Sequence, residues 1–317
     1  MKADMAHSPS AGRILITPRS LTHGGLDSNA ELNPLSDAGY ELVTATAGAT
    51  PTEDELQALV PGCVGWLAGV ERVSAATIAA ASDLRIIARN GVGTDNIDMR
   101  AAADAGVTVT TAAGANAQGV AELAVTLALS CLRHVPWSSA SLRVGGWDRW
   151  PAKEVSEITV GIVGLGAIGR KVAGAFSALG ARVLGYDPYS TVEGIDAVSL
   201  DELVAASDVV TLHAPPPEDG SALIDTARLA LFANGAILVN TARAALVDEK
   251  AVLATLEEGR LSAYAVDAFD TEPPELSPML LHPRVVATPH IGAYTTASVS
   301  RATAMAVESL LTNLETR

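Results

Sequence analysis

The chain has 317 residues, of which 49% are hydrophobic and 4% aromatic, and its formal net charge is −15. That length allows two domains with proper cores. The acidic balance argues against nucleic acid as a partner, because a nucleic-acid backbone requires a basic face. No apolar run is long enough to span a bilayer, so no membrane association is expected.

The N-terminus and the cysteines indicate the cellular compartment. The first dozen residues lack the apolar core of a signal peptide, and we expect them to form a mobile tail. Cys63 and Cys131 lie far apart in sequence in apolar surroundings, which is typical of reduced core residues. We therefore expect a cytoplasmic protein, and we expect no metal site.

The first part of the chain alternates short apolar strands with helical segments. Strands are expected at 13–17, 40–44, 63–67, 84–88 and 107–111. A helix over 52–59 begins with a capping box made by Thr52 and Glu55. Residues 116–134 are expected to form a long helix, apolar enough to be buried between domains or between subunits.

The same alternation continues after Trp150. Strands are expected at 158–164, 181–187, 208–213, 235–240 and 262–267. Helices are expected at 167–180, at 199–207 with a second capping box, and from near Thr295. Strands that alternate with helices predict an α/β fold in which helices cover parallel sheets.

A glycine-rich turn marks a dinucleotide site. GIVGLGAIGR (161–170) contains Gly164, Gly166 and Gly169 between a predicted strand and a predicted helix. Asp187 ends the next strand 18 residues after Gly169, the spacing expected for a carboxylate that binds a ribose. Such a carboxylate repels a 2′-phosphate, so the pattern favours NAD over NADP. The alternative interpretation is a turn that only packs helix on strand.

Four polar side chains follow the later strands. Arg243 follows strand 235–240, Asp267 ends strand 262–267, Glu272 lies in the loop beyond, and His290 follows RVVATP (284–289). Each alone has an ordinary explanation: a surface cation, a turn cap, a solvated acid or a structural histidine. Ligands of parallel sheets bind beyond the carboxyl ends of the strands, so their joint placement beside a dinucleotide site indicates an active site.

Several of these segments together resemble a known family. NTARAALVDE (240–249), VDAFDTEPP (266–274), TPHIGAYT (288–295) and the GLGAIG turn resemble the D-2-hydroxyacid dehydrogenases, closest to the D-3-phosphoglycerate dehydrogenase-like branch. NGVGTDNID (90–98) and GANAQGVAELAV (114–125) belong to the same pattern, which runs from about residue 60 to 300. No C-terminal regulatory domain is expected after Arg317.

The resemblance implies an architecture. The fold class is α/β, with two Rossmann-like, doubly wound parallel-sheet domains and the active site in the cleft between them. A discontinuous substrate-binding domain would comprise residues 1–111 and 291–317, and an NAD-binding Rossmann domain would comprise 112–290. The resemblance also implies a homodimer built around helix 116–134, which would account for the apolarity of that helix.

The resemblance also implies roles for the strand-end residues. Arg243 would bind the substrate carboxylate and polarise the 2-oxo group, for which a planar fork of donors is well suited. His290 would be the acid/base, and Glu272 would hold its orientation and favour the imidazolium. Asp267 would bond the nicotinamide carboxamide. The implied reaction transfers a hydride between NAD(H) and a small, anionic D-2-hydroxy acid or 2-oxo acid.

The remaining contacts are implied by the same resemblance. The residues expected to bind the cofactor are Gly164, Gly166, Ala167, Ile168, Gly169, Asp187, His213, Ala242, Asp267 and Gly292. The residues expected to hold the substrate carboxylate, beside Arg243, are Asn90, Gly91, Val92 and Gly93, which would use backbone N–H groups.

Three features depart from the family pattern. Ala244 stands where the arginine is usually followed by glycine, which would cost about 1 kcal/mol if the backbone needed positive φ there. PPPEDGS (215–221) replaces the usual loop near the adenine end. Around 65–74 no arginine stands where phosphate-binding members tend to carry one, and Arg72 is out of step. This last departure questions phosphoglycerate as the substrate.

Two other functions are compatible with the fold. One is a non-catalytic NAD-sensing module, like the corepressor relatives, against which the intact set of Arg243, Glu272 and His290 argues. The other is formate or phosphite oxidation. Formate enzymes carry glutamine at the Glu272 position and phosphite enzymes carry lysine near Asn90, and neither residue is present here.

Overall fold

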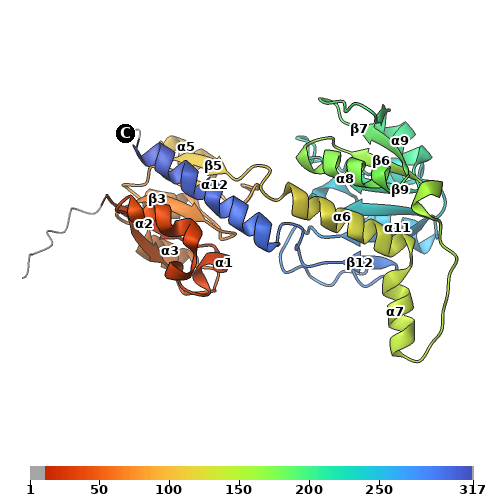
Figure 1. The fold of residues 1–317 in the computed structure, drawn as a ribbon, viewed down its shortest axis with the longest axis horizontal. Coiled ribbons are helices and arrows are strands. Elements are labelled where there is room, and N and C mark those ends of the chain that lie inside the picture. Colours follow the sequence, from red (N-terminus) through yellow and green to blue (C-terminus); the bar gives the residue numbers. More distant parts are fainter. Residues whose placement is uncertain (1–10, 316–317) are drawn as a thin grey trace, which may run out of the picture. The chain divides into compact units, whose positions relative to one another are not determined.

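The computed structural model describes residues 11–315, so most of the expected N-terminal tail lies outside the described residues. The chain divides into two compact units (Figure 1). Unit 1 contains the chain up to Asn116 and from Thr296 onward, and unit 2 is Ala117–Thr295. Each change of unit lies five residues after the boundary expected from the motifs, at 116 instead of 111 and at 295 instead of 290.

Unit 1 is a five-stranded parallel sheet covered by helices on both faces. Its strands are β1 (Arg13–Ile16), β2 (Glu41–Thr44), β3 (Cys63–Ala68), β4 (Ile86–Arg89) and β5 (Thr108–Thr111), in the order β2-β1-β3-β4-β5. Its α-helices are α1 (Arg19–Thr22), α2 (Asn33–Asp37), α3 (Glu53–Leu59), α4 (Ala75–Ala79), α5 (Met99–Asp104) and α12 (Thr296–Glu315).

The central strands of unit 1, β1, β3 and β4, are buried on both faces, as expected for a parallel sheet. Ile14 and Ile16 of β1 pack in one core with Leu310 of α12, together with residues of α2. Leu15, between them, faces the opposite core, which α3, α4 and α5 complete around the fully buried Trp66. Helix α12 therefore closes a face of a sheet whose strands come from the first third of the chain.

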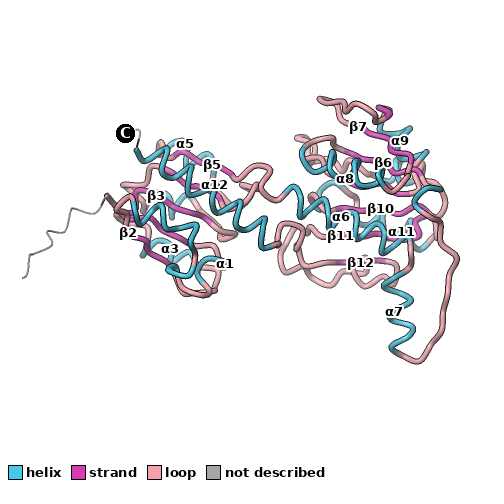
Figure 2. Tube along the Cα trace, in the orientation of Figure 1, coloured by secondary structure: helices cyan, strands magenta, loops and turns pink. Residues whose placement is uncertain are grey.

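Unit 2 is a seven-stranded parallel sheet, also covered on both faces (Figure 2). Its strands are β6 (Thr159–Val163), β7 (Arg182–Tyr186), β8 (Asp196–Ala197), β9 (Val209–Leu212), β10 (Ala236–Asn240), β11 (Leu261–Val266) and β12 (Val285–Ala287), in the order β12-β11-β10-β9-β6-β7-β8. Its α-helices are α6 (Ala117–Leu132), α7 (Val135–Arg143), α8 (Ala167–Ala178), α9 (Leu200–Ala206), α10 (Thr226–Leu229) and α11 (Glu249–Glu257). Helices α6 and α8 cover one face, and α9, α10 and α11 cover the other.

The predicted α/β fold class is confirmed, because both sheets are parallel and doubly wound. All the expected strands are present, with ends within two residues of the prediction, and both capping boxes form. The single helix expected over 116–134 is wrong at its end. Helix α6 stops at Leu132, His134 adopts a left-handed conformation with φ of 54°, and the unpredicted α7 begins at Val135.

None of the helices in the described part of the chain is both long and apolar enough to cross a membrane.

Candidate active site

The order of the strands reverses in unit 2 between β6 and β9, which is where open α/β sheets bind nucleotides. The glycine turn follows β6 at this point. Gly164 has a φ of +94°, and a Cβ there would lie 2.6 Å from the backbone carbonyl carbon of His213. A Cβ on Gly169 would lie 1.9 Å from the Gly164 carbonyl oxygen. Both positions therefore exclude any side chain.

The start of α8 is open in the way that a pyrophosphate needs. Nothing lies within 4 Å of a Cβ built on Gly166, and no side-chain hydrogen bond caps the helix at that residue. Ala167 and Ile168 supply the first helical N–H groups, and a helix N-terminus attracts anions through those groups and through its dipole. These residues fit the dinucleotide that the sequence predicts.

Asp187 holds the glycine turn. Its Oδ2 accepts a hydrogen bond of 2.8 Å from the Leu165 N–H, and its Oδ1 accepts one of 2.8 Å from the Tyr189 N–H. The carboxylate is half-buried at the end of β7. Each oxygen keeps a further lone pair, so the same group can still accept from ribose hydroxyls.

His213 directly follows β9 and lies beside the glycine turn. Its Nε2 lies 2.9 Å from the Thr211 hydroxyl, and its shielded Nδ1 has no hydrogen-bond partner among the described residues. Burial lowers the pKa of the imidazole to about 3, so the ring is neutral at physiological pH. A neutral ring next to the predicted cofactor site can donate or accept a hydrogen bond without adding charge.

Arg243 lies beyond β10 in a loop that Asn240 organises. The fully buried Asn240 donates from Nδ2 to the Arg243 carbonyl at 2.8 Å and accepts at Oδ1 from the Ala242 N–H at 3.1 Å. The Arg243 guanidinium donates from Nη1 to the Ala242 carbonyl at 2.8 Å. The Asn240 side chain thus fixes the backbone of the loop. Arg243 is half-buried at the strand end.

Asp267 ends β11 and ties down the segment that follows β12. The side chain is 1% exposed. Its Oδ1 accepts from the Thr288 hydroxyl at 2.6 Å and from the Ile291 N–H at 2.9 Å, and its Oδ2 accepts from the Gly292 N–H at 2.8 Å. One buried carboxylate therefore holds the chain on both sides of His290.

His290 and Glu272 are brought together at the same edge. His290 Nδ1 lies 2.5 Å from Glu272 Oε1, and each side chain is 44% exposed. His290 adopts φ of 52°, a left-handed conformation that non-glycine residues rarely take and that here lies within the segment Asp267 clamps. Because Nδ1 faces the carboxylate, Nε2 is the ring nitrogen left for a substrate.

Unit 1 carries the remaining predicted residues, at the end of β4. The Asn90 N–H bonds the Ala68 carbonyl at 2.9 Å, and the Asn90 Oδ1 has no hydrogen-bond partner within residues 11–315. Gly91 has φ of +159°, and its carbonyl accepts from the Ala112 N–H at 2.8 Å. Val92 is 42% exposed, and Gly93, which follows it, is half-buried.

Comparison with known proteins identifies the family of this chain. The family model described as D-isomer specific 2-hydroxyacid dehydrogenase, NAD binding domain, matches residues 125–292. D-3-phosphoglycerate dehydrogenase of Mycobacterium tuberculosis is 41% identical over 268 residues, which cover 82% of this chain and 51% of that protein. Hydroxypyruvate reductase of Thermotoga maritima is 38% identical over 270 residues, which cover 83% of this chain and 88% of that protein.

The chain belongs to the D-isomer specific 2-hydroxyacid dehydrogenase family. A solved protein of Thermus thermophilus has the same fold, with a TM-score of 0.86 and 35% identity over 96% of this chain and 97% of that chain. Residues 125–292, within unit 2, form the NAD-binding domain of the family. The chain spans about half the length of the D-3-phosphoglycerate dehydrogenases that it matches, 51% in the Mycobacterium tuberculosis protein.

Ala244, in place of the family's usual glycine, causes no backbone strain. Among the described non-glycine residues only His134 and His290 have positive φ. Ala244 instead begins a short 3-10 turn and is buried. The cost expected for a left-handed alanine therefore does not arise.

Two residues that organise the candidate site were not predicted from the sequence. Asn240 fixes the Arg243 loop, and Thr288 donates to Asp267 beside His290. The sequence signal for Asn240 was the sudden polar residue at the end of an apolar strand. Thr288 had no such signal, because a threonine after a strand is common in loops. Within residues 11–315, no three His, Cys, Asp or Glu side chains are grouped to hold a metal ion.

Proposed function

We propose that the protein is an NAD-dependent dehydrogenase that interconverts a small D-2-hydroxy acid and its 2-oxo acid. The observation that carries the proposal is the pair of His290 Nδ1 and Glu272 Oε1 at 2.5 Å, on a segment clamped by Asp267 within the NAD-binding domain of this family. A histidine oriented by a carboxylate partner is suited to general acid/base catalysis, and its left-handed backbone is a local strain of the kind found at active sites.

The residues of the glycine turn fit NAD. Gly164, Gly166 and Gly169 leave room for the pyrophosphate at the start of α8, and Asp187 offers a carboxylate to the ribose. We assign the nicotinamide end to His213, Ala242, Asp267 and Gly292, at the neighbouring strand ends. When bound, the nicotinamide supplies or accepts the hydride.

The protein's own groups handle the proton and the charge. In reduction of a 2-oxo acid, imidazolium Nε2 of His290 donates a proton to the carbonyl oxygen while Glu272 stabilises the positive ring. In oxidation, neutral Nε2 accepts the hydroxyl proton. Arg243 pairs with the substrate carboxylate through its planar fork and stabilises the charge that grows on the oxygen. We assign the second hold on the carboxylate to the N–H groups of residues 90–93.

An assay of NADH oxidation tests the proposal. Purified protein is mixed with NADH and with glyoxylate, pyruvate, hydroxypyruvate or phosphohydroxypyruvate in turn, and absorbance at the nicotinamide band is followed. We expect turnover with at least one 2-oxo acid. Binding of NADH without turnover of any acid would contradict the proposal and would favour the NAD-sensing alternative.

We also propose a homodimer, with its interface extended beyond helix α6. Nine residues of α6 are already buried in this single chain, so packing within the chain accounts for most of the apolarity of that helix. Five of the exposed large apolar side chains of the described residues lie instead in α7 and the loop after it, which project from unit 2 (Figure 1). They are Val135, Leu142, Val144, Trp147 and Trp150. An apolar group of this kind on a projecting arm is typical of an interface.

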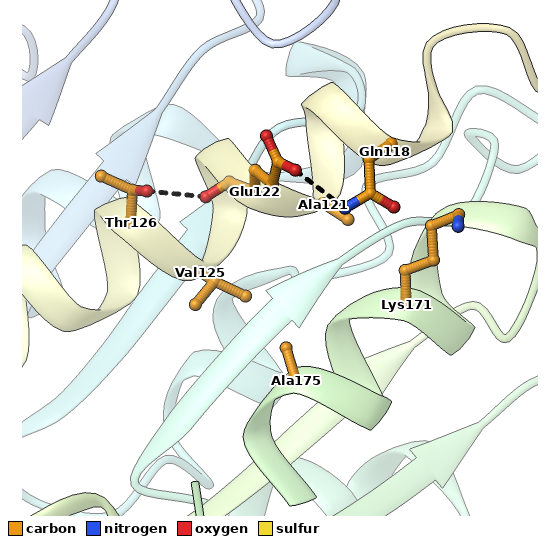
Figure 3. Close-up of a pocket in the computed structure, with 7 residues that line it drawn as sticks. All are labelled: Gln118, Ala121, Glu122, Val125, Thr126, Lys171 and Ala175. Atoms are coloured by element: carbon orange, nitrogen blue, oxygen red, sulfur yellow. Dashed lines mark hydrogen bonds between the residues drawn. The ribbon is translucent and has the colours of Figure 1, made fainter. Parts of the chain in front are cut away.

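A groove between α6 and α8 supports the same interface (Figure 3). It has a volume of about 260 Å³. Its lining residues are Gln118, Ala121, Glu122, Val125, Thr126, Lys171 and Ala175. Val125 and Ala175 supply apolar surface, while Gln118 donates to Glu122 along one side at 2.8 Å. We propose that an apolar side chain of a second copy occupies it.

Light scattering tests the dimer. We expect twice the chain mass for the wild type at micromolar concentration and a single chain mass for the double variant Leu142→Ser, Trp147→Ser. Leu231→Ser, which changes another exposed leucine of unit 2, is the control and should stay dimeric. A wild-type mass of one chain would contradict the proposal.

For the location we propose the cytoplasm, supported by two cysteines, Cys63 and Cys131, that are free and buried.

A further inference from the structure

The sheet of unit 1 has its own reversal of strand order, between β1 and β3. Open parallel sheets of this order bind ligands outside the carboxyl ends of the strands at that point. Thr17 follows β1 there, and the segment 69–71 follows β3. The next strand, β4, leads into Asn90, the first residue proposed to hold the substrate carboxylate.

A buried carboxylate lies at this reversal. Glu71 is 2% exposed, and its Oε1 accepts from the Gly69 N–H at 2.9 Å and from the Thr17 hydroxyl. The Thr17 oxygen in turn accepts from the Trp66 indole N–H at 2.9 Å. Asn96 donates to the backbone carbonyl of Glu71. Glu71 is therefore fixed by groups from several loops, not solvated at the surface.

Arg89 at this edge directs its guanidinium to the protein backbone. Arg89 donates from Nη1 to the Asn90 carbonyl at 3.0 Å, and its Nη1 would lie 3.0 Å from a Cβ on Gly91. Burial lowers the pKa of the Arg89 guanidinium, while the negative charges of Glu71 and Asp95 oppose that shift. Two carboxylates thus act on one guanidinium, and the cluster has no excess positive charge to offer an anion.

Two apolar side chains lie on the outer surface of the same edge, beside the exposed Arg72. Val70, between Gly69 and Glu71, is 65% exposed, and Val92 in the neighbouring loop is 42% exposed. Exposed valines at the ends of two adjacent strands can contact a small uncharged group. They cannot neutralise a phosphate.

We infer that the strand ends of unit 1 select 2-oxo acids with a small uncharged tail and reject phosphorylated ones, with Glu71 as the residue that sets this preference. The inference rests on the proposed dehydrogenase function and deepens it. A phosphate would bring two more negative charges beside a carboxylate that is held in low dielectric, where repulsion is strong. An uncharged tail meets no such repulsion.

Hydroxypyruvate and phosphohydroxypyruvate make the matched test, because they share a carbon skeleton and differ by the phosphate. We expect the wild type to show at least a tenfold higher kcat/KM for hydroxypyruvate. Glu71→Gln keeps an oxygen for the Gly69 N–H and removes the charge, so the ratio of the two kcat/KM values should shift roughly tenfold toward the phosphorylated acid. Wild-type preference for phosphohydroxypyruvate, or an unchanged ratio in folded Glu71→Gln, would overturn the inference.

Two controls separate Glu71 from charge effects in general. Asp83→Asn makes the same charge change at an exposed residue before β4, at the opposite end of the strand, and should leave the ratio within twofold. Arg72→Ala removes the exposed cation next to Glu71 and should also leave it within twofold. A large loss of phosphohydroxypyruvate activity in Arg72→Ala would assign anion binding to that arginine and overturn the inference.

Failure of the inference is distinguishable from failure of the proposed function. If no 2-oxo acid is turned over, the function fails, and calorimetric titration of both acids into NADH-loaded protein still reports which one binds more tightly. If Glu71→Gln does not fold, Val70→Arg replaces it as the test. An added cation at that exposed position should raise kcat/KM for phosphohydroxypyruvate about tenfold. An unchanged kcat/KM would contradict the inference that this edge faces the substrate tail.

Discussion

The strand ends of the two units differ in where they place charge. In unit 2 the polar pair of Glu272 and His290 lies at the surface, each side chain 44% exposed. In unit 1 the corresponding edge buries its carboxylate, with Glu71 only 2% exposed, and exposes Val70 and Val92 beside Arg72. Both sheets are parallel and doubly wound, so the difference lies in the loops.

We relate this contrast to the two roles proposed for the strand ends, which are proton exchange with the substrate in unit 2 and selection of the substrate tail in unit 1. Groups that exchange a proton with the substrate must remain accessible. A buried residue can still fix their position, as Asp267 does for the chain around His290. A surface that only discriminates among substrate tails needs a suitable shape and a nearby charge. A buried residue behind that surface can provide the charge. Four substitutions test the roles assigned to unit 2, from the largest expected effect to the smallest.

Replacing the accessible histidine should have the largest effect. His290→Ala is expected to lower turnover roughly 10²–10⁴-fold, the usual contribution of a positioned general acid or base. Binding of NADH, measured by fluorescence titration, should change little, because the glycine turn and Asp187 hold the dinucleotide. His282→Ala is the control histidine of unit 2. Near wild-type turnover of His290→Ala across pH 5 to 9 would make His290 structural.

Replacing the residue behind His290 should cost less. Asp267→Asn places an amide where Oδ2 now accepts from the Gly292 N–H, so at least one hydrogen bond to a charged group is lost. Such a bond is worth about 1.5–3 kcal/mol, which corresponds to roughly 10–100-fold in kcat. The KM for the oxo acid should change less than kcat. The exposed Asp270→Asn serves as control, and an equal loss there would remove the positioning role of Asp267.

The buried histidine of unit 2 should affect stability in acid. Burial holds the pKa of folded His213 at about 3, against an ordinary value of 6.5. Between these values the unfolded chain binds more protons, so the free energy of unfolding decreases as the pH falls below about 6.5. From pH 7 to pH 5 the loss is roughly 2 kcal/mol. His213→Asn should lack this component in urea unfolding, whereas His282→Asn should retain it; parallel curves for the wild type and His213→Asn would contradict the burial argument.

The smallest effect concerns the choice of cofactor. Asp187→Asn keeps an acceptor for the Leu165 N–H while it removes the charge that disfavours a 2′-phosphate. We expect wild-type preference for NADH over NADPH to narrow roughly tenfold, or about 1.4 kcal/mol. Asp196→Asn, on the exposed strand β8, should leave the preference unchanged. Equal wild-type efficiency with both cofactors would contradict the assignment of Asp187.

Features made by residues close together in the sequence could be predicted, for a physical reason. The glycine turn and Asp187 lie within one βαβ segment. The geometry of this segment fixes the sequence spacing between Gly164, Gly169 and Asp187, so the pattern can be recognised in the sequence. The two capping boxes were readable for the same reason, because a cap joins residues three apart. Strand positions followed from apolar runs, since both faces of a parallel sheet are buried.

Features made by distant residues could not be read in this way. The hydrogen bond from Thr17 to Glu71 joins residues 54 apart, and the one from Trp66 to Thr17 spans 49. Nothing in the local sequence separates a buried Glu71 from a solvated one. The end of α6 was missed because the residues after it remain compatible with a helix, and only the left-handed turn at His134 divides α6 from α7.

Helix α12 has a consequence for how the molecule is made. Unit 2 is one continuous stretch, Ala117–Thr295, and its core can close once that stretch has left the ribosome. Unit 1 needs residues 296–315 to cover Ile14, Ile16 and Ile86, so its sheet keeps an open apolar face until the last part of this sequence is synthesised. The third of the chain that is translated first is therefore completed last, and its apolar face stays open to contact with other chains until α12 has been synthesised.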